Sequence, residues 1–248
     1  MPTYVLVPGA WLGGWVWHEV AGRLRAAGHE VFPDTFTGLG ERSHLARPDI
    51  DLETHITDVV NILTWNDLTD VILAGHSYAG TVITGVADRV PERIAQLVYV
   101  DSAPLADGVA MTDLYTPEAL AGVQRTVDEL GDRWRLPFPG VEGLEQDASL
   151  RGLDESDRAL LAARAVAHPW GTYTQPLCLE RQGPPAYRQV VIACDDVRGM
   201  VAPGVPQIVP LTREPWQYVE LDTGHWPMLS APGELARLFD GLAAGSAK

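Results

Sequence analysis

Short apolar runs alternate with helical patterns along most of the chain. Helices are predicted at residues 15–27, 52–65, 80–89 and 231–243, and strands at residues 3–7, 30–33, 70–74, 94–100, 189–194 and 217–221. Most of the strands are continuously apolar, which indicates that both of their faces are covered. Alternation of strands with helices favours parallel strand pairing. The pattern therefore predicts a three-layer α/β sandwich.

This alternation stops between about residues 105 and 188. Proline, glycine, arginine and acidic residues surround short helical patches there, at residues 117–130 and 155–167. We interpret the segment as a helical cap inserted into a single domain that spans residues 1–248.

Composition narrows the class of protein. The chain has 248 residues, of which 46% are hydrophobic, enough for one substantial core. It contains no apolar run of about 18 residues and no basic, apolar leader, so we expect a soluble, cytoplasmic protein. The formal net charge of −15 disfavours nucleic acid and anionic membranes as partners. Two cysteines, Cys178 and Cys194, are too few for a disulfide framework or a thiolate metal site.

The segment from Gly75 to Gly80, GHSYAG, carries the clearest chemical signal. It follows a β-branched strand and precedes a helix, which is the setting of a nucleophile elbow. In such an elbow a serine on a sharp turn exposes its hydroxyl above the sheet, and here that serine is Ser77. Ala79 stands where a second glycine is usual, and Gly80 follows it.

A serine hydroxyl needs a positioned base to act as a nucleophile near neutral pH. His225 is the best candidate because it follows the last strand, where its loop meets the elbow at the carboxyl edge of the sheet. His76 is expected to be structural and to point away from the nucleophile. The remaining histidines are expected to be ordinary surface or core residues: His18, His29, His44, His55 and His168.

A carboxylate should fix the tautomer of the histidine. Asp196, which follows the strand at residues 189–194, is preferred because it preserves the order serine, acid, histidine. Asp101, at the end of the strand after the nucleophile helix, is the alternative acid, and Asp195 comes behind both.

Acyl transfer also requires donors for the developing oxyanion. The backbone N–H of Tyr78 is one candidate, and Ala10, in the glycine-rich loop at residues 8–14, is the other. That loop lacks the lysine and the glycine spacing of a phosphate-binding turn. Trp11, Tyr78 and Trp226 stand beside these residues in the sequence, so Trp11 and Trp226 are predicted to bind a small, largely apolar substrate. Further aromatic residues are available from the cap, at Trp134 and Trp170.

The motifs occur in a familiar order. The chain contains VPGAWLGGWVW, TGLGERSH, GHSYAG, LVYVDSAP and GHWPM. Over nearly its whole length except the cap, it resembles the α/β-hydrolase group that includes plant methylesterases, hydroxynitrile lyases and many bacterial esterases. The resemblance implies a mostly parallel sheet of about six strands, no metal and no organic cofactor. It also implies hydrolysis of a carboxylic ester, thioester or lactone through an acyl-enzyme.

Three positions depart from the group. Pro8 replaces a histidine before the oxyanion glycine, and Trp226 stands where the hydroxynitrile lyases have lysine, which disfavours cyanohydrin cleavage. Asp196 follows Cys194 by two residues, whereas three are usual. Because a fold does not fix the reaction, a lyase, cyclase or cofactor-free oxygenase on the same scaffold stays open as an alternative. The unsettled acid also leaves open a non-catalytic small-molecule binding protein. The expected partner is a small-molecule substrate, and self-association into a homodimer is left open.

Overall fold

A parallel sheet forms the centre of the computed structural model, which describes residues 1–181 and 183–245. Within these residues, six strands are ordered β2-β1-β3-β4-β7-β8, and every neighbouring pair is parallel. The strands are β1 (Thr3–Val7), β2 (Glu30–Pro33), β3 (Val71–His76), β4 (Ile94–Val100), β7 (Arg188–Ala193) and β8 (Gln217–Glu220). The predicted α/β-hydrolase fold is confirmed in this sheet and its flanking helices.

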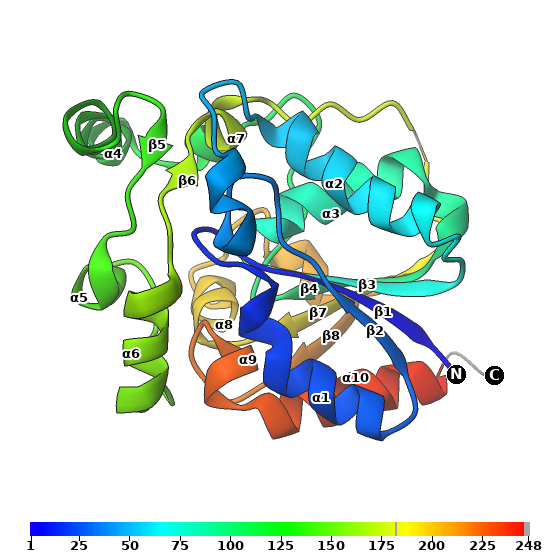
Figure 1. Cartoon of the computed structure of the whole chain (residues 1–248). Helices are drawn as coiled ribbons and strands as arrows, with labels where there is room; N and C mark the ends of the chain where they lie inside the picture. Colours follow the sequence, from blue (N-terminus) through cyan, green and yellow to red (C-terminus); the bar gives the residue numbers. More distant parts are fainter. Residues whose placement is uncertain (182, 246–248) are drawn as a thin grey trace.

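Helices cover both faces of the sheet (Figure 1). On one face lie α2 (Leu52–Trp65) and α3 (Ala79–Arg89), and on the other lie α1 (His18–Ala26) and α10 (Pro232–Ala244). Successive side chains of a strand point to opposite faces. Val5 of β1 packs in the core beside α2 and α3, whereas Leu6 packs in the core beside α1 and α10. Two buried cores explain why the strands are continuously apolar.

Several element boundaries differ from the prediction by a few residues. The first helical segment is divided into a 3-10 turn, η1 (Gly14–Trp17), and α1. Strand β3 continues to His76, which brings the strand directly to the elbow serine. The sequence pattern missed α8 (Asp195–Val201), a short helix that begins with two aspartates. The remaining short elements of the core are η2 (Gly40–Leu45), η3 (Pro91–Arg93), η5 (Val209–Thr212) and α9 (Pro227–Ser230).

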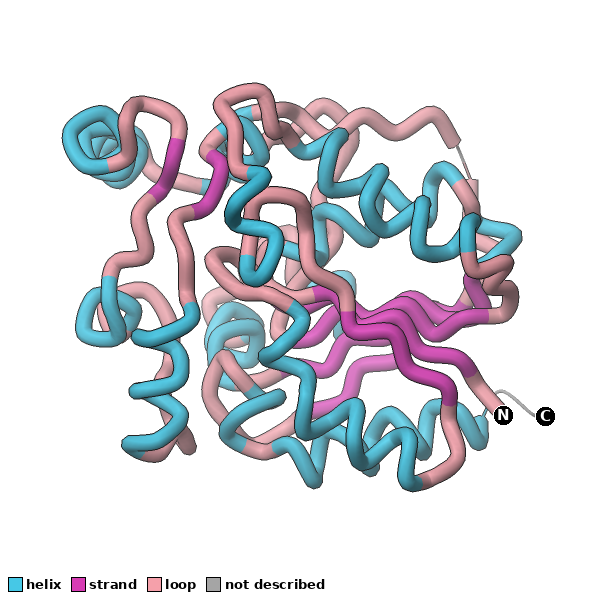
Figure 2. Tube along the Cα trace, in the orientation of Figure 1, coloured by secondary structure: helices cyan, strands magenta, loops and turns pink. Residues whose placement is uncertain are grey.

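The cap segment (residues 105–187) connects β4 to β7. Part of it lies to one side of the sheet, where α4, α5 and α6 are seen at the left of Figures 1 and 2. Two very short strands of this segment, β5 and β6, pair with each other in antiparallel orientation. Its elements are η4 (Met111–Leu114), α4 (Pro117–Leu130), β5 (Arg135–Leu136), α5 (Gly140–Leu144), α6 (Glu155–Arg164), β6 (His168–Pro169) and α7 (Gly171–Thr174). The helix predicted at residues 117–130 has these bounds, and the one predicted at 155–167 ends three residues early.

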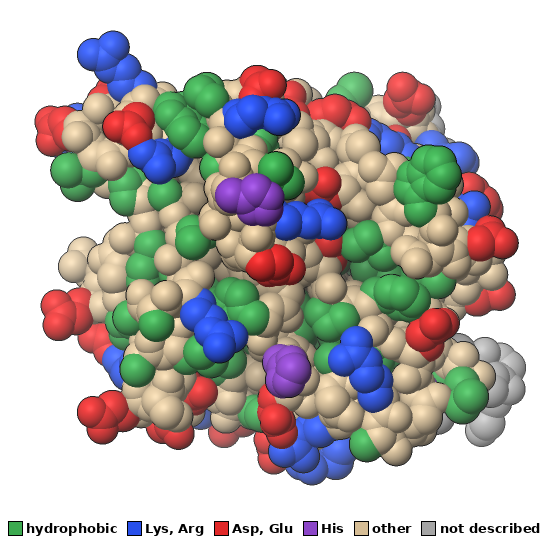
Figure 3. All heavy atoms as spheres, in the orientation of Figure 1, with side chains coloured by type: hydrophobic (Ala, Val, Ile, Leu, Met, Phe, Trp, Pro, Cys, Tyr) green, Lys and Arg blue, Asp and Glu red, His purple; other side chains and the backbone are tan. Residues whose placement is uncertain are grey.

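One face of the molecule carries side chains of both charges (Figure 3). On the face shown in Figure 3, acidic and basic side chains are interspersed and the hydrophobic side chains are scattered between them. No helix among the described residues is long and apolar enough to cross a membrane.

Candidate active site

Ser77 occupies the junction between β3 and α3 in a left-handed backbone conformation. Its φ is 51°, a conformation that costs a non-glycine residue roughly 1–3 kcal/mol unless its surroundings impose it. The Ser77 N–H donates to the Val100 carbonyl at 3.2 Å. The Ser77 carbonyl accepts from the Gly80 N–H at 2.9 Å and from the Ser102 hydroxyl at 2.6 Å. These bonds hold the strained turn that the elbow motif predicts.

Two glycines allow this turn to pack closely. A Cβ added at Gly75 would lie 2.8 Å from the Ala79 carbonyl oxygen. A Cβ at Gly80 would lie 2.1 Å from the Ser102 Oγ and 2.9 Å from the Ala103 carbonyl oxygen. The close contact between the elbow and Ser102 therefore occurs at Gly80, whereas the methyl group of Ala79 is accommodated in the core.

Gly80→Ala is expected to lower the free energy of unfolding by about 1–3 kcal/mol, because the new methyl group overpacks the elbow. Gly22 is the matched control, since it lies in α1 and an added Cβ there meets nothing within 4 Å. Gly22→Ala should raise the free energy of unfolding by about 0.5–1 kcal/mol. Urea unfolding of both variants measures the difference. Equal effects at the two positions would contradict the packing described for the elbow.

His225 lies in the loop between β8 and α9 and is fixed by its own backbone. Its N–H donates to the Ser149 carbonyl at 2.8 Å, and its carbonyl accepts from His76 Nε2 at 2.7 Å. The His76 ring packs 4.7 Å from the His225 ring. His76 is thus a buried support of the histidine loop, as a structural residue should be.

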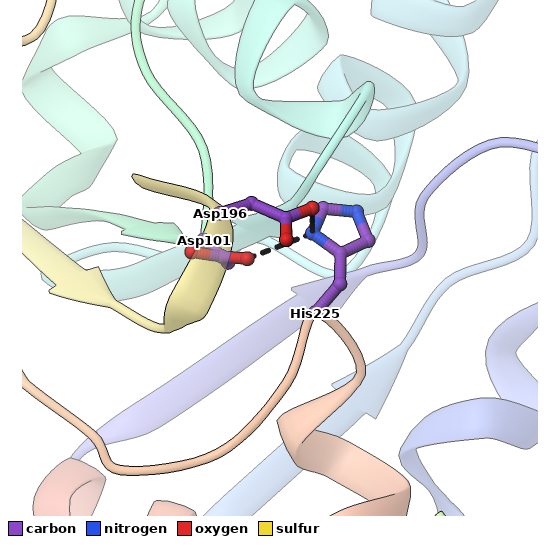
Figure 4. Close-up of side chains that lie close together, drawn as sticks. All are labelled: Asp101, Asp196 and His225. Carbon is purple, nitrogen blue, oxygen red and sulfur yellow. Dashed lines mark hydrogen bonds and ion pairs between the residues drawn. The ribbon is translucent and has the colours of Figure 1, made fainter. Parts of the chain in front are cut away.

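Two carboxylates approach the same nitrogen of His225 (Figure 4). Asp101 Oδ2 lies 2.8 Å from His225 Nδ1, and Asp196 Oδ2 lies 3.1 Å from it. The structure therefore brings together both of the main acid candidates. A proton on Nδ1 satisfies either oxygen, which leaves Nε2 as the unprotonated, basic nitrogen.

Asp101 is the more enclosed of the two carboxylates. Its side chain is fully buried, whereas that of Asp196 is 19% exposed. The second oxygen of Asp101 accepts the backbone N–H groups of Cys194 and Val197 at 2.9 and 3.1 Å. Asp101 thus has fixed partners for both oxygens, and it makes the shorter contact with His225. The geometry therefore favours Asp101, the alternative acid, over Asp196, which the sequence order preferred.

Asp195 and Asp196 point in different directions although they are adjacent. The second oxygen of Asp196 accepts the Ser149 N–H at 2.9 Å. Asp195 instead pairs with Arg151 at 2.7 Å and accepts the Ser149 hydroxyl at 2.8 Å. The structure does not place Asp195 at the histidine.

The two carboxylates also change the protonation of His225. Burial alone would lower the pKa of the imidazole, but hydrogen bonds and charges from Asp101 and Asp196 outweigh burial and raise this pKa to about 9. The ligand atoms of these three side chains lie within 4.8 Å of one another, a spacing that could also hold a cation. A proton on Nδ1, which the proposed role of the carboxylates requires, would occupy the position between them.

The two predicted oxyanion donors flank Ser77. A Cβ added at Gly9 would lie 3.1 Å from the Ser77 Cβ and 2.7 Å from His76 Nδ1, so the loop after β1 passes directly against the elbow. Within residues 1–181 and 183–245, the N–H groups of Ala10 and Tyr78 have no protein acceptor. Two unpaired donors beside a strained serine can stabilise a negative oxygen.

A cavity of about 560 Å³ opens over Ser77, His225 and both carboxylates. Most of its other lining is apolar and comes from the residues after β4 and from α8 and the loop after it. The main apolar contributors are Leu105, Met111, Leu114, Met200, Val205 and Ile208. Sequence reasoning missed these residues, because short loops and an unpredicted helix carry them.

The two predicted substrate-binding tryptophans are not among the residues that line this cavity. Trp226 is 4% exposed and packs in the core beside α1 and α10, with its ring 4.8 Å from that of His225. The Trp11 indole turns to the cap, where it donates to the Leu136 carbonyl at 3.1 Å and packs against Phe138. Sequence proximity to Ala10 and His225 identified the neighbourhood but could not give the side-chain direction.

The family model described as the alpha/beta hydrolase family matches residues 4–238. The chain belongs to the α/β-hydrolase family. It is 37% identical, over 246 residues, to a carbendazim hydrolyzing esterase of Nocardioides sp. (strain SG-4G), which covers 98% of this chain and 100% of that protein. It is 27% identical, over 267 residues, to a pyrethroid hydrolase of Sphingobium wenxiniae, and the match covers 98% of this chain and 88% of that protein. These similarities place this α/β hydrolase among the carboxylic ester hydrolases.

Solved structures show the same fold. An extracellular alpha/beta-hydrolase from a Paenibacillus species, described as sharing homology with tobacco salicylic acid binding protein 2, has a TM-score of 0.81 and 24% identity, covering 97% of this chain and 98% of that one. Tomato methylketone synthase I has a TM-score of 0.77 and 19% identity, with 99% and 98% covered. At these identities the likeness supports the fold alone.

Proposed function

We propose that this α/β hydrolase cleaves a small, uncharged, largely apolar carboxylic ester, with thioesters and lactones as related substrates, through an acyl-enzyme on Ser77. The observation that carries the proposal is the opening of one apolar cavity onto Ser77, His225 and a buried, fully hydrogen-bonded Asp101.

The proposed reaction has two halves. His225 Nε2 takes the proton of the Ser77 hydroxyl as Oγ bonds to the carbonyl carbon, and the carbonyl oxygen becomes an oxyanion that accepts from the Ala10 and Tyr78 N–H groups. The imidazolium then protonates the departing alcohol, and the carbon–oxygen bond to it breaks. Water repeats the sequence against the acyl-enzyme and releases the acid. Asp101 holds the Nδ1 proton throughout, and Asp196 adds a second negative charge beside the imidazolium.

The pH dependence should report the raised pKa of His225. Only the neutral imidazole can accept the Ser77 proton, so kcat/KM should rise with pH, reach half of its plateau near the pKa of about 9 and level off above it. Asp196→Asn removes one of the carboxylates that raise this pKa, so its acidic limb should shift to lower pH. Discontinuous assays across the pH range, corrected for uncatalysed hydrolysis, measure the acidic limb of the wild type and that of the variant. A shift to higher pH in the variant would contradict the assigned cause.

The charge of the cavity restricts the substrate. Asp101, Asp113 and Asp196 line it, and none of its lining residues is lysine or arginine. A substrate carboxylate about 6–8 Å from such a charge meets roughly 1–2 kcal/mol of repulsion at an intermediate dielectric constant. Neutral acyl chains are therefore favoured over anionic ones.

A pair of p-nitrophenyl esters tests the function and this preference together. We expect turnover of the butyrate, and about tenfold lower kcat/KM for the singly esterified glutarate at low salt. Asp113→Asn should lower the ratio of kcat/KM for the butyrate to kcat/KM for the glutarate severalfold. Asp128→Asn, at an exposed position of α4, should leave this ratio unchanged. Carbendazim belongs in the panel because of the Nocardioides relative. Absence of turnover across the panel, together with saturable ligand binding, would instead favour the binding-protein alternative, and non-hydrolytic products would favour a lyase, cyclase or oxygenase.

A further inference from the structure

His168, from the cap segment, lies beside both proposed oxyanion donors. Its side chain is fully buried. Its Nδ1 accepts the backbone N–H of Trp11 at 3.2 Å, and Trp11 directly follows Ala10. Its ring also packs edge-on against the Tyr78 ring, with centroids 4.7 Å apart. One imidazole therefore contacts the two chain segments that supply the N–H groups.

Hydrogen bonding fixes the tautomer of this imidazole. The Thr172 hydroxyl donates to the Pro169 carbonyl at 2.8 Å, so its oxygen accepts from His168 Nε2, also at 2.8 Å. With the proton on Nε2, Nδ1 is the acceptor that the Trp11 N–H requires. Burial, and secondly the neighbouring His55, hold the pKa of His168 well below its ordinary value, which keeps the ring neutral.

The Trp11 backbone needs such a restraint. Its φ is 64°, in the left-handed region that a bulky residue rarely adopts. The cap segment makes two further hydrogen bonds to this residue: the Val166 N–H donates to the Trp11 carbonyl at 3.0 Å, and the Trp11 indole donates to the Leu136 carbonyl at 3.1 Å. Three cap contacts therefore converge on the residue next to Ala10.

The Tyr78 side is restrained in a similar way. The Tyr78 hydroxyl donates to His55 Nδ1 at 2.9 Å, and His55 Nε2 donates to the Thr37 carbonyl at 3.0 Å. The His55 and His168 rings lie edge-on at 5.7 Å. The two halves of the proposed oxyanion hole are thus joined through one buried group of rings.

We propose that His168 is a positioning residue for ester hydrolysis, through which the cap segment sets the distance and direction of the Ala10 N–H relative to Ser77 and Tyr78. This inference rests on the proposed function. It gives the cap segment a role in the chemical step. A donor that is displaced from its correct position loses more of its stabilisation of the transition state than of its stabilisation of the bound ester.

Variants at His168 separate this role from general packing. His168→Asn keeps an acceptor near the position of Nδ1, whereas His168→Gln reaches toward the position of Nε2 and His168→Leu has no acceptor. We expect the Gln and Leu variants to lose about 10- to 100-fold in kcat with KM within about threefold. The Asn variant should stay within about fivefold of the wild type. The Asn and Gln pair decides the matter if the Leu variant does not fold.

A trifluoromethyl ketone supplies a readout of the oxyanion site itself. Ser77 Oγ adds to its carbonyl carbon, and the oxygen becomes an oxyanion that mimics the reaction intermediate. Its inhibition constant should rise in parallel with the loss of kcat in the Gln and Leu variants, and should stay near the wild-type value in the Asn variant. Val127→Ala, a buried change in α4, controls for a loosened cap.

Two results would overturn the positioning role: wild-type kcat and inhibition in the Gln variant, or an equal loss in Val127→Ala at matched loss of stability. Either result leaves the proposed function standing, provided that the wild type turns over esters and Ser77→Ala does not. Failure of the wild type itself would reject the proposed function instead.

Discussion

Ser77→Ala is expected to lower kcat/KM for a neutral p-nitrophenyl ester by at least about 10⁴-fold. The variant removes the only atom that the proposed mechanism uses to form the acyl-enzyme, and what is left is the activity of the oxyanion donors and of binding. His225→Gln should cost a similar factor, because the hydroxyl then has no base. Initial rates at saturating and limiting ester measure both effects.

The double variant sharpens this prediction. Ser77 and His225 act as one unit, so their joint loss should cost little more than either single change. Ser43→Ala, at an exposed position outside the cavity, serves as the serine control and should retain wild-type rates. Additive losses in the double variant would mean that the two residues act independently, contrary to the proposed mechanism.

Asp101→Asn is expected to lower kcat/KM by roughly 10³-fold even at the high-pH plateau. The amide would present a donor to His225 Nδ1, which favours the tautomer with its proton on Nε2 and so removes the base. The backbone N–H groups of Cys194 and Val197 both donate to the same oxygen of Asp101, so they would hold the amide oxygen of the variant and leave its amide nitrogen facing His225. Plateau rates, with stability followed by thermal unfolding, separate lost chemistry from lost folding.

The neighbouring aspartates provide the controls. Asp196→Asn should cost less than about tenfold at the plateau, because Asp101 still holds the Nδ1 proton. Asp195→Asn should have a smaller effect again, since Asp195 pairs with Arg151 and does not reach the histidine. A larger loss in Asp196→Asn than in Asp101→Asn would return the acid role to Asp196.

Periodicity sufficed to predict the fold because both faces of the sheet are buried. Most strands of the sheet therefore read as short apolar runs, and the predicted ends of the strands and main helices fall within about three residues of those observed. Helix α8 escaped because a seven-residue helix with two leading aspartates has no apolar period.

The candidate site could be predicted where one motif determines both position and direction. The elbow at Ser77 and the last loop at His225 are such cases. The acid could not be settled, because two strand ends converge on Nδ1 and only their three-dimensional spacing distinguishes them. The direction of the tryptophan rings could not be predicted for a related reason: Trp11 and Trp226 have the expected neighbours in sequence, but their rings point into the cap and the core. His168 gave no signal, because its contact with Trp11 spans 157 positions of the chain.

The most direct test of the central claim is to identify the atom that becomes covalently modified by a p-nitrophenyl organophosphate. The account predicts stoichiometric release of p-nitrophenol, a single phosphoryl adduct on the peptide that contains Ser77, parallel loss of esterase activity, and no adduct in Ser77→Ala. Modification at another residue, or full esterase activity in protein whose Ser77 is completely modified, would contradict the assignment of Ser77 as nucleophile.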